Sequence, residues 1–279
     1  MADIPCGGRQ ERRLPLDGCF NCRDMGGYVR EDSRSIAWGR IFRSDALHRL
    51  SPRDKQYFES LGLRTVIDFR SPGEAEKQKD ILPAGASHEI LNPHANLAQA
   101  ASAVRDNDEE KIKKLLALTE TPEGREFFKK NANAMADQMR LLVTGQSALT
   151  AYGLFFRRLL EAPLPLLFHC QGGKDRTGWA AVLFLLALGF SRECARSDYL
   201  LTREMNRERN QRRMDEYRQY TDHPLVLEYL YSLMDVREVY IDAAFAEMDR
   251  VAKNPQEYLQ TYLQVSPQDL SALQAKYIV

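Results

Sequence analysis

The feature that most constrains the fold of this 279-residue chain is a short apolar run that leads directly into a glycine-containing loop. Pro165–Phe168 has the length and composition of a buried β-strand, and Thr177–Leu188 predicts a strongly apolar helix. Between them lies the loop His169–Arg176, with Gly172 and Gly173 near its centre. A strand, a loop and a helix in this order predict an α/β unit whose loop lies at the carboxyl end of the strand.

Other segments extend this unit to an alternating series of strands and helices. Apolar or β-branched runs predict strands at Arg40–Arg43, Arg64–Phe69 and His88–Leu91, and shorter ones at 28–29 and 35–38. Helices are expected over 51–61 and 147–160 and, in two or three pieces, over 239–279. Ser-Pro or Thr-Pro pairs at 51, 121 and 266 have the pattern of helix starts. The alternation predicts an α/β fold with a central, mostly parallel sheet flanked by helices.

The chain is expected to form a single domain over residues 1–279, because its 44% of hydrophobic residues are enough for a substantial core. A polar, helical stretch at about 93–145 predicts an insertion, and about 200–240 predicts a lid. Arg203–Arg218 carries six arginines and four acidic residues with little apolar periodicity. This segment is either a solvated helix face or a helix that faces the substrate.

Charge and cysteine usage narrow the classes of partner and the compartment. Basic and acidic residues balance at 39 each, so the net charge gives no indication of nucleic-acid binding. No run approaches the roughly 18 apolar residues of a membrane span, and the first residues lack the pattern of a signal peptide. Five cysteines, an odd number, are typical of a reducing compartment. We expect a cytoplasmic protein, with export by a route that needs no visible signal peptide as the alternative.

The loop His169–Gly178 has the form HCxxGxxRTG, which is suited to binding an anion such as phosphate or sulfate. Its glycines let successive backbone N–H groups converge, and the positive end of the following helix points at the same place. That field favours the thiolate of Cys170, the form that attacks phosphorus. Arg176 is planar and always charged, so it can hold two phosphoryl oxygens. The predicted phosphate-binding residues are Gln171, Gly172, Gly173, Lys174, Asp175, Arg176 and Thr177, with Cys170 as nucleophile.

Two neighbours of Cys170 are expected to support it. The hydroxyl of Thr177 can donate a hydrogen bond to the Cys170 sulfur and ease its departure when water cleaves a thiophosphate. His169 is expected to orient the loop and to tune the thiolate rather than to act as a base.

These residues match the signature of the protein tyrosine phosphatase superfamily. Four further segments resemble its bacterial tyrosine/serine phosphatase family: Asn21–Tyr28, Gly39–Ser44, Thr65–Ser71 and Asp198–Leu201. The resemblance implies a tyrosine-phosphatase-like fold and a dual- or triple-specificity phosphatase that works through a phosphocysteine. One departure is Cys22, where the family usually has phenylalanine, and this leaves the packing of that turn open.

Two aspartates are candidates for the general acid that protonates the leaving group. Mammalian-type tyrosine phosphatases use a Trp-Pro-Asp loop, and no Pro-Asp pair occurs in this sequence. Asp175, inside the loop as in myotubularin-like lipid phosphatases, is favoured, and Asp68, at the end of its strand, is the rival. Arg70 is expected to pair with Glu74 and to brace the turn after Asp68.

The sequence leaves more than one interpretation of the substrate and of the function. Lys174 adds a second positive charge that suits a phosphoinositide headgroup, as in lipid phosphatases of the superfamily. Alternatively, its charge raises the electrostatic potential for any phosphate, including that of a phosphorylated protein. A catalytically silent phosphate-binding module is the first alternative function. A redox protein that uses Cys19 and Cys22 is the second, and either Cys22 or Cys194 is a possible disulfide partner for an oxidised Cys170. No metal or other cofactor is expected, because the sequence suggests no cluster of ligands and the loop supplies its own positive charge.

Overall fold

A five-stranded sheet forms the centre of the computed structural model, which describes residues 12–95, 108–132 and 134–279. The strand order is β1-β2-β5-β3-β4, with β1 antiparallel to β2 and every other pair parallel. The α/β fold with a mostly parallel sheet is therefore confirmed. The strands are β1 (Arg23–Asp24), β2 (Ile41–Ser44), β3 (Thr65–Asp68), β4 (Ser87–Ile90) and β5 (Leu166–His169).

The central strand β5 carries the predicted anion loop to the middle of one sheet edge. Its last residue, His169, lies opposite Ser44 of β2 and Asp68 of β3 in the register of the sheet. Because parallel strands end at the same edge, the segments that follow β2, β3 and β5 meet around the loop. The site is thus assembled from three segments that are far apart in the sequence.

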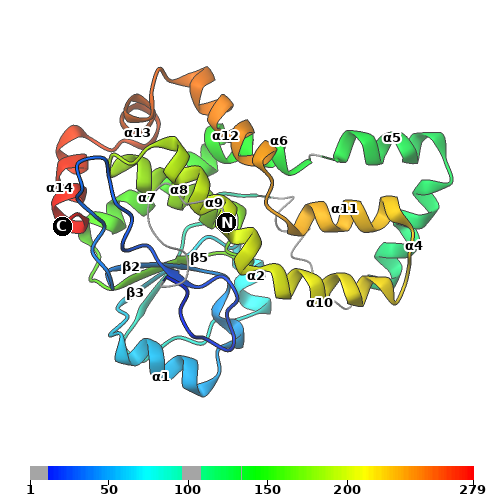
Figure 1. Ribbon diagram of the computed structural model, residues 1–279, viewed down its shortest axis with the longest axis horizontal. Coiled ribbons are helices and arrows are strands. Elements are labelled where there is room, and N and C mark those ends of the chain that lie inside the picture. Colours follow the sequence, from blue (N-terminus) through cyan, green and yellow to red (C-terminus); the bar gives the residue numbers. More distant parts are fainter. Residues whose placement is uncertain (1–11, 96–107, 133) are drawn as a thin grey trace.

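Alternate residues of the strands point to the two faces of the sheet, and helices cover both faces (Figure 1). Phe42, Val66 and Leu167 pack with α1 (Pro52–Ser60) on one face. Ile67 and Phe168 belong to the larger core on the other face. The helices that contribute to this core are α6 (Ala134–Thr144), α7 (Gln146–Glu161), α8 (Asp175–Ala187), α9 (Arg192–Met205), α12 (Glu238–Val251), α13 (Pro255–Leu263) and α14 (Pro267–Tyr277).

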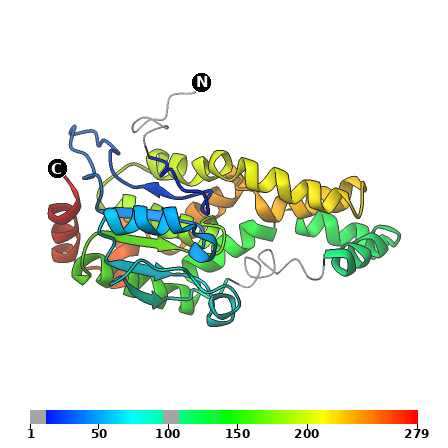
Figure 2. The same ribbon diagram turned by 90° about the horizontal axis from the view of Figure 1, so that it is seen from below.

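Four further helices extend away from the sheet on one side, as Figures 1 and 2 show. We call α4 (Asp108–Thr119), α5 (Pro122–Asn131), α10 (Arg207–Arg218) and α11 (Pro224–Met234) the helical extension. Phe128, Met214 and Leu230 are among the residues of a separate apolar cluster that holds it together. Helices α4 and α5 of the predicted insertion therefore pack against the helices of the predicted lid, whereas α6 belongs to the main body.

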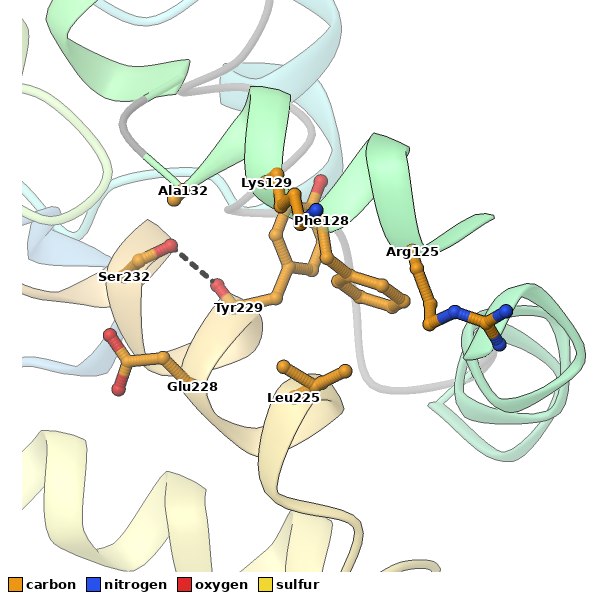
Figure 3. A pocket seen from close by; sticks show the side chains of 8 residues that line it. All are labelled: Arg125, Phe128, Lys129, Ala132, Leu225, Glu228, Tyr229 and Ser232. Atoms are coloured by element: carbon orange, nitrogen blue, oxygen red, sulfur yellow. Dashed lines mark hydrogen bonds between the residues drawn. The ribbon is translucent and has the colours of Figure 1, made fainter. Parts of the chain in front are cut away.

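The helical extension contains a cavity of about 320 Å³ between α5 and α11 (Figure 3). Its wall is mainly apolar, with Phe128, Leu225 and Tyr229 facing the space. Arg125 and Lys129 of α5 and Glu228 of α11 stand around these rings. The charged groups are partly engaged elsewhere, since Glu228 pairs with Arg237.

The predicted helix starts are confirmed by their caps. Ser51 and Ser266 each form a capping box, and the Thr121 side chain accepts a hydrogen bond from the Gly124 N–H. The short strands predicted at 28–29 and 35–38 are wrong, because this stretch makes only the isolated bridges Val29–Ser35 and Ile36–Ile278. The carboxyl end of the chain takes the place of a strand partner there. Part of the helical stretch predicted at 93–145 lies outside the described residues. No helix within the described ranges is long and apolar enough to span a membrane.

The short elements η1 (Leu47–Arg49) and α2 (Pro72–Lys77) follow β2 and β3. The Ser71 side chain and Glu74 form a capping box at the start of α2. This box turns the chain sharply just after β3 and brings the first turn of α2 to the edge of the sheet where the loop lies.

Candidate active site

The loop between β5 and α8 has the geometry of an anion site. Cys170 follows the last residue of β5, and α8 begins at Asp175 with no side-chain cap on its first N–H groups. Uncapped N–H groups and the helix dipole together favour a bound anion. The loop is tight because Gly173 has φ of +61°, and a Cβ there would stand 2.5 Å from the Ser44 carbonyl oxygen. Only glycine fits this position without strain.

The Cys170 thiol is buried and its pKa lies below the ordinary value. Burial alone would raise the pKa. The positive charge of Arg176 and the nearby hydroxyl and N–H groups of Thr177 outweigh burial and favour the thiolate. The Thr177 hydroxyl makes no hydrogen bond to another described residue, so its predicted donation to the sulfur stays a prediction.

Arg176 is held in place by a carboxylate that the sequence did not assign to it. Its two terminal nitrogens donate to Glu74 at 2.8 and 2.9 Å, and one of them also donates to the Phe69 carbonyl at 3.1 Å. The third donor, Nε, is buried and has no partner among the described residues. The guanidinium is therefore fixed through its terminal nitrogens, while Nε is available to donate a hydrogen bond to an anion above Cys170.

The predicted pair of Arg70 and Glu74 is wrong. Glu74 binds Arg176 instead, whereas the Arg70 guanidinium donates to Asp68 at 2.7 to 3.0 Å and also binds Asp80. The capping box at the start of α2 sets the Glu74 backbone at the mouth of the loop, so its side chain reaches across the sheet edge to α8. Arg70 braces the turn after Asp68 without the help of Glu74.

Replacing Glu74 with glutamine is expected to lower kcat/KM for p-nitrophenyl phosphate by about 10- to 100-fold, because Arg176 loses its orienting carboxylate. Glu74 is a positioning residue, so inhibition by inorganic vanadate should weaken in parallel. Glu76→Gln, on the exposed side of the same short helix, is the matched control. Full activity and unchanged vanadate inhibition of Glu74→Gln would show that Arg176 is oriented without Glu74.

A buried network of charges fixes the loop from behind. Asp198 of α9 pairs with Arg23 and Arg43 and accepts a hydrogen bond from the Tyr28 hydroxyl at 2.8 Å. Arg43 in turn donates to the Gly173 carbonyl at 2.8 Å. Burial would raise the pKa of Asp198, but the two arginines outweigh it and lower the pKa to about 2. Three of the segments that carry the family resemblance therefore meet in this network. The network reaches the Gly173 carbonyl of the loop through Arg43.

Asn21 gives the loop a second support. Its side-chain N–H₂ donates to the Gly173 carbonyl at 2.8 Å and to the Gly172 carbonyl at 3.3 Å. These bonds fix the positions of both carbonyls, and converging N–H groups in a loop of this kind can bind an anion.

Four side chains behind the loop form a cluster that corrects the expectation of no ligand cluster. One ligand atom each from Asp68, Asp80, His88 and His169 lie within 4.8 Å of one another. They meet because β3, β4 and β5 are adjacent parallel strands. The Arg70 guanidinium already binds both carboxylates, so a permanent cation occupies the place that a metal ion would take.

Charge balance in this cluster keeps Asp68 ionised. Burial would raise its pKa, but His169, His88 and Arg70 hold it well below the usual range. Burial also opposes the charging of His169, but the two carboxylates raise its pKa. Hydrogen bonds to Asp68 and Asp80 raise the pKa of His88 to about 9. His169 thus lies against this cluster, with Nδ1 3.2 Å from the Cys170 carbonyl oxygen.

The Lys174 side chain points to the end of α11 and pairs with Asp175. The Lys174 ammonium donates to the carbonyls of Leu233 at 2.8 Å and Asp235 at 3.2 Å, and lies 3.1 Å from one Asp175 oxygen. The other Asp175 oxygen is buried and has no hydrogen-bond partner among the described residues. Lys174 is therefore committed to carbonyl groups, while Asp175 keeps a free oxygen beside the loop.

The remaining predicted residues are placed as follows. The Gln171 side chain donates to the side chain of Gln78 at the end of α2. Cys19 and Cys22 are buried thiols, and burial is the main reason that the pKa of each is raised. Cys22, which stands where the family usually has phenylalanine, packs in the apolar cluster beneath α1. Raised thiol pKa values oppose a redox role for this pair.

Comparisons with known proteins identify the class of enzyme to which this fold and this loop belong. The model of the tyrosine phosphatase family matches residues 14–279, so the chain belongs to this family. Its members are phosphoric monoester hydrolases, and this is the enzyme class of the chain.

Two named relatives agree with this assignment. A protein of Cupriavidus necator, provisionally named a tyrosine-protein phosphatase, is 29% identical over 95% of this chain and 88% of its own length. The triple specificity protein phosphatase PtpB of Mycobacterium tuberculosis is 33% identical over 68% of each chain. The predicted family is thereby confirmed.

Proposed function

We propose that this phosphatase works through Cys170. The thiolate attacks phosphorus, the ester P–O bond breaks, and a phosphocysteine forms while the leaving oxygen takes a proton. Water then attacks the phosphocysteine, releases inorganic phosphate and regenerates the thiolate. The observation that carries the proposal is the lowered pKa of Cys170 beside an Arg176 that Glu74 holds in place.

The positive groups of the loop stabilise the charge that spreads over the phosphoryl oxygens. In this proposal Arg176 and the backbone N–H groups of Gln171–Thr177 bind those oxygens, and the uncapped start of α8 supports this. Thr177 donates to the sulfur when it leaves phosphorus in the second step. His169 and Arg70 support the loop from the cluster behind it.

Asp175 is the general acid in this proposal. It supplies a proton to the leaving oxygen and takes one from the attacking water in the second step. Its free oxygen beside the loop supports this role. Asp68 is the weaker candidate because three cations keep it ionised and its oxygens are bound to Arg70.

Asp175→Asn is expected to lower kcat for phosphoserine peptide by about 100-fold, since general acids contribute 10²–10⁴. With p-nitrophenyl phosphate, whose leaving group needs no proton, the loss should be much smaller. Asp68→Asn is the comparison variant. A loss that depends on the leaving group in Asp68→Asn, with Asp175→Asn unaffected, would reverse the two roles.

The substrate class is a phosphorylated protein residue or a phosphoinositide. The name of PtpB supports action on more than one kind of phosphate ester. The side chain of Lys174 gives no support to lipid specificity, because its ammonium is bound to carbonyl groups. The cytoplasmic location expected from the cysteines is consistent with the unpaired thiols of Cys19, Cys22 and Cys170.

The test is release of inorganic phosphate from phosphotyrosine peptide, phosphoserine peptide and a phosphoinositide panel, with Cys170→Ser as background. We expect release from at least one class that depends on Cys170, and the ranking of kcat/KM identifies the substrate. If the intact, reduced protein releases no phosphate from any of them, the chain is a phosphate-binding module instead.

A further inference from the structure

The arginines of the segment 203–218 do not form a uniformly solvated face. Arg209 differs from most of the others because its guanidinium lies over the phosphate loop. A Cβ placed on Gly172 would stand 3.3 Å and 3.6 Å from its two terminal nitrogens, so the guanidinium lies close to this glycine. Four others pair with carboxylates: Arg203 with Asp235, Arg212 with Glu208, Arg213 with Asp108 and Arg218 with Asp215.

The start of α10 is fixed to the loop, so the position of Arg209 is set by the fold. The Asn206 side chain donates to the Gly172 carbonyl at 3.2 Å, and that of Asn210 donates to the Met234 carbonyl at 3.3 Å. Arg209 lies between these two anchors on the helix. Its guanidinium is therefore held at the mouth of the site.

Arg209 carries a charge that the described residues leave without a hydrogen-bonded anion. No hydrogen bond or ion pair joins its guanidinium to another residue in the described ranges. Burial lowers the pKa of Arg209, and Arg49 lowers it further, while Asp45 and Cys170 act in the opposite direction. A half-buried cation beside a thiolate is well placed to bind a second anion next to the first.

Two other arginines lie near this place. The guanidinium groups of Arg49 and Arg212 lie 5.5 Å and 5.8 Å from the ring centre of Phe20, next to the Asn21 that supports the loop. The nearby Asp45 carboxylate accepts hydrogen bonds from the N–H groups of Phe20 and Asn21 and lies 3.8 Å from the Arg49 guanidinium. Arg49 and Arg212 thus face Asp45 and Glu208, whereas no carboxylate pairs with Arg209 among the described residues.

We propose that Arg209 forms a second anion subsite beside the phosphate loop, which binds a second phosphate of the substrate. The substrate class is a compact phosphate monoester with two phosphates on one ring, such as a bisphosphorylated cyclitol. The substrate is compact because Arg209 lies next to the loop itself, so the second phosphate lies close to the scissile one. This inference rests on the proposed function, since the scissile phosphate occupies the loop of Cys170.

The test is calorimetric binding to Cys170→Ser of inositol monophosphate and of inositol bisphosphates with vicinal and 1,3-related phosphates. At least one bisphosphate should bind about tenfold more tightly than the monophosphate, the value of one charge-assisted contact. Adding Arg209→Gln should abolish this gain. Arg207→Gln, an exposed arginine of the same helix, should preserve it.

Equal affinity for monophosphate and bisphosphates, or a gain that survives Arg209→Gln, overturns the subsite. A gain seen with a doubly phosphorylated peptide and with none of the cyclitols overturns the substrate class. Turnover of p-nitrophenyl phosphate by the native protein is measured alongside. Turnover without the gain contradicts only the subsite, whereas the gain without turnover contradicts only the proposed hydrolysis.

Discussion

Cys170→Ser is expected to lower kcat for p-nitrophenyl phosphate by at least about 10⁴-fold, because the proposed reaction loses its nucleophile. A serine hydroxyl in the same place is a far weaker nucleophile than a thiolate whose pKa is already lowered by Arg176 and Thr177. Steady-state release of p-nitrophenol measures the effect. The loop should remain intact, so inorganic phosphate should still bind.

Cys194→Ala serves as the control, since Cys194 is a buried thiol on α9 and the proposal gives it no chemical role. It should keep most of its activity. Turnover by Cys170→Ser within tenfold of the native protein would rule out a thiolate mechanism. It would direct attention to a water activated elsewhere in the site.

Arg176→Lys is expected to lower kcat/KM by about 10³-fold, the lower range for arginines that stabilise phosphoryl transfer. Lysine keeps the charge but cannot form the bidentate bond to Glu74 while presenting a further donor to the anion. Kinetics with p-nitrophenyl phosphate measures the loss. Arg192→Lys, a partly exposed arginine paired with Asp249, should leave activity unchanged.

A second measurement on Arg176 separates charge from geometry. The charge of Arg176 lowers the pKa of Cys170, so Arg176→Met should raise it, whereas Arg176→Lys should leave it near the native value. The pH dependence of alkylation of Cys170 by iodoacetamide reports this pKa. An unchanged pKa in Arg176→Met would mean that Thr177 and the helix dipole alone stabilise the thiolate.

The parts of the site that are local in sequence could be predicted. The strand before Cys170, the loop and the apolar helix follow one another directly, so β5 and α8 have nearly the expected bounds. The Ser-Pro and Thr-Pro helix starts depend on hydrogen bonds within four residues and are confirmed by their caps. The resemblance of Asn21–Tyr28 to its family also indicated a functional segment before its role was visible.

The contacts that join distant segments could not be predicted. Arg176 and Glu74 are 102 positions apart, and the sequence offered the nearer pair of Arg70 and Glu74 instead. The direction of the Lys174 side chain depends on carbonyls at the end of α11. The place of Arg209 depends on the docking of α10 against Gly172, and the charged pattern of its segment gave no sign of which arginine faces the loop.

The central claim is that a phosphocysteine forms at Cys170, and mass spectrometry of acid-quenched protein tests it most directly. Native protein quenched during turnover of p-nitrophenyl phosphate should carry one phosphoryl group on the peptide that contains Cys170. Asp175→Asn should accumulate more of it if Asp175 also accepts the proton from the attacking water. Sustained turnover with no phosphoryl group on Cys170, or with one on another residue, would contradict the mechanism.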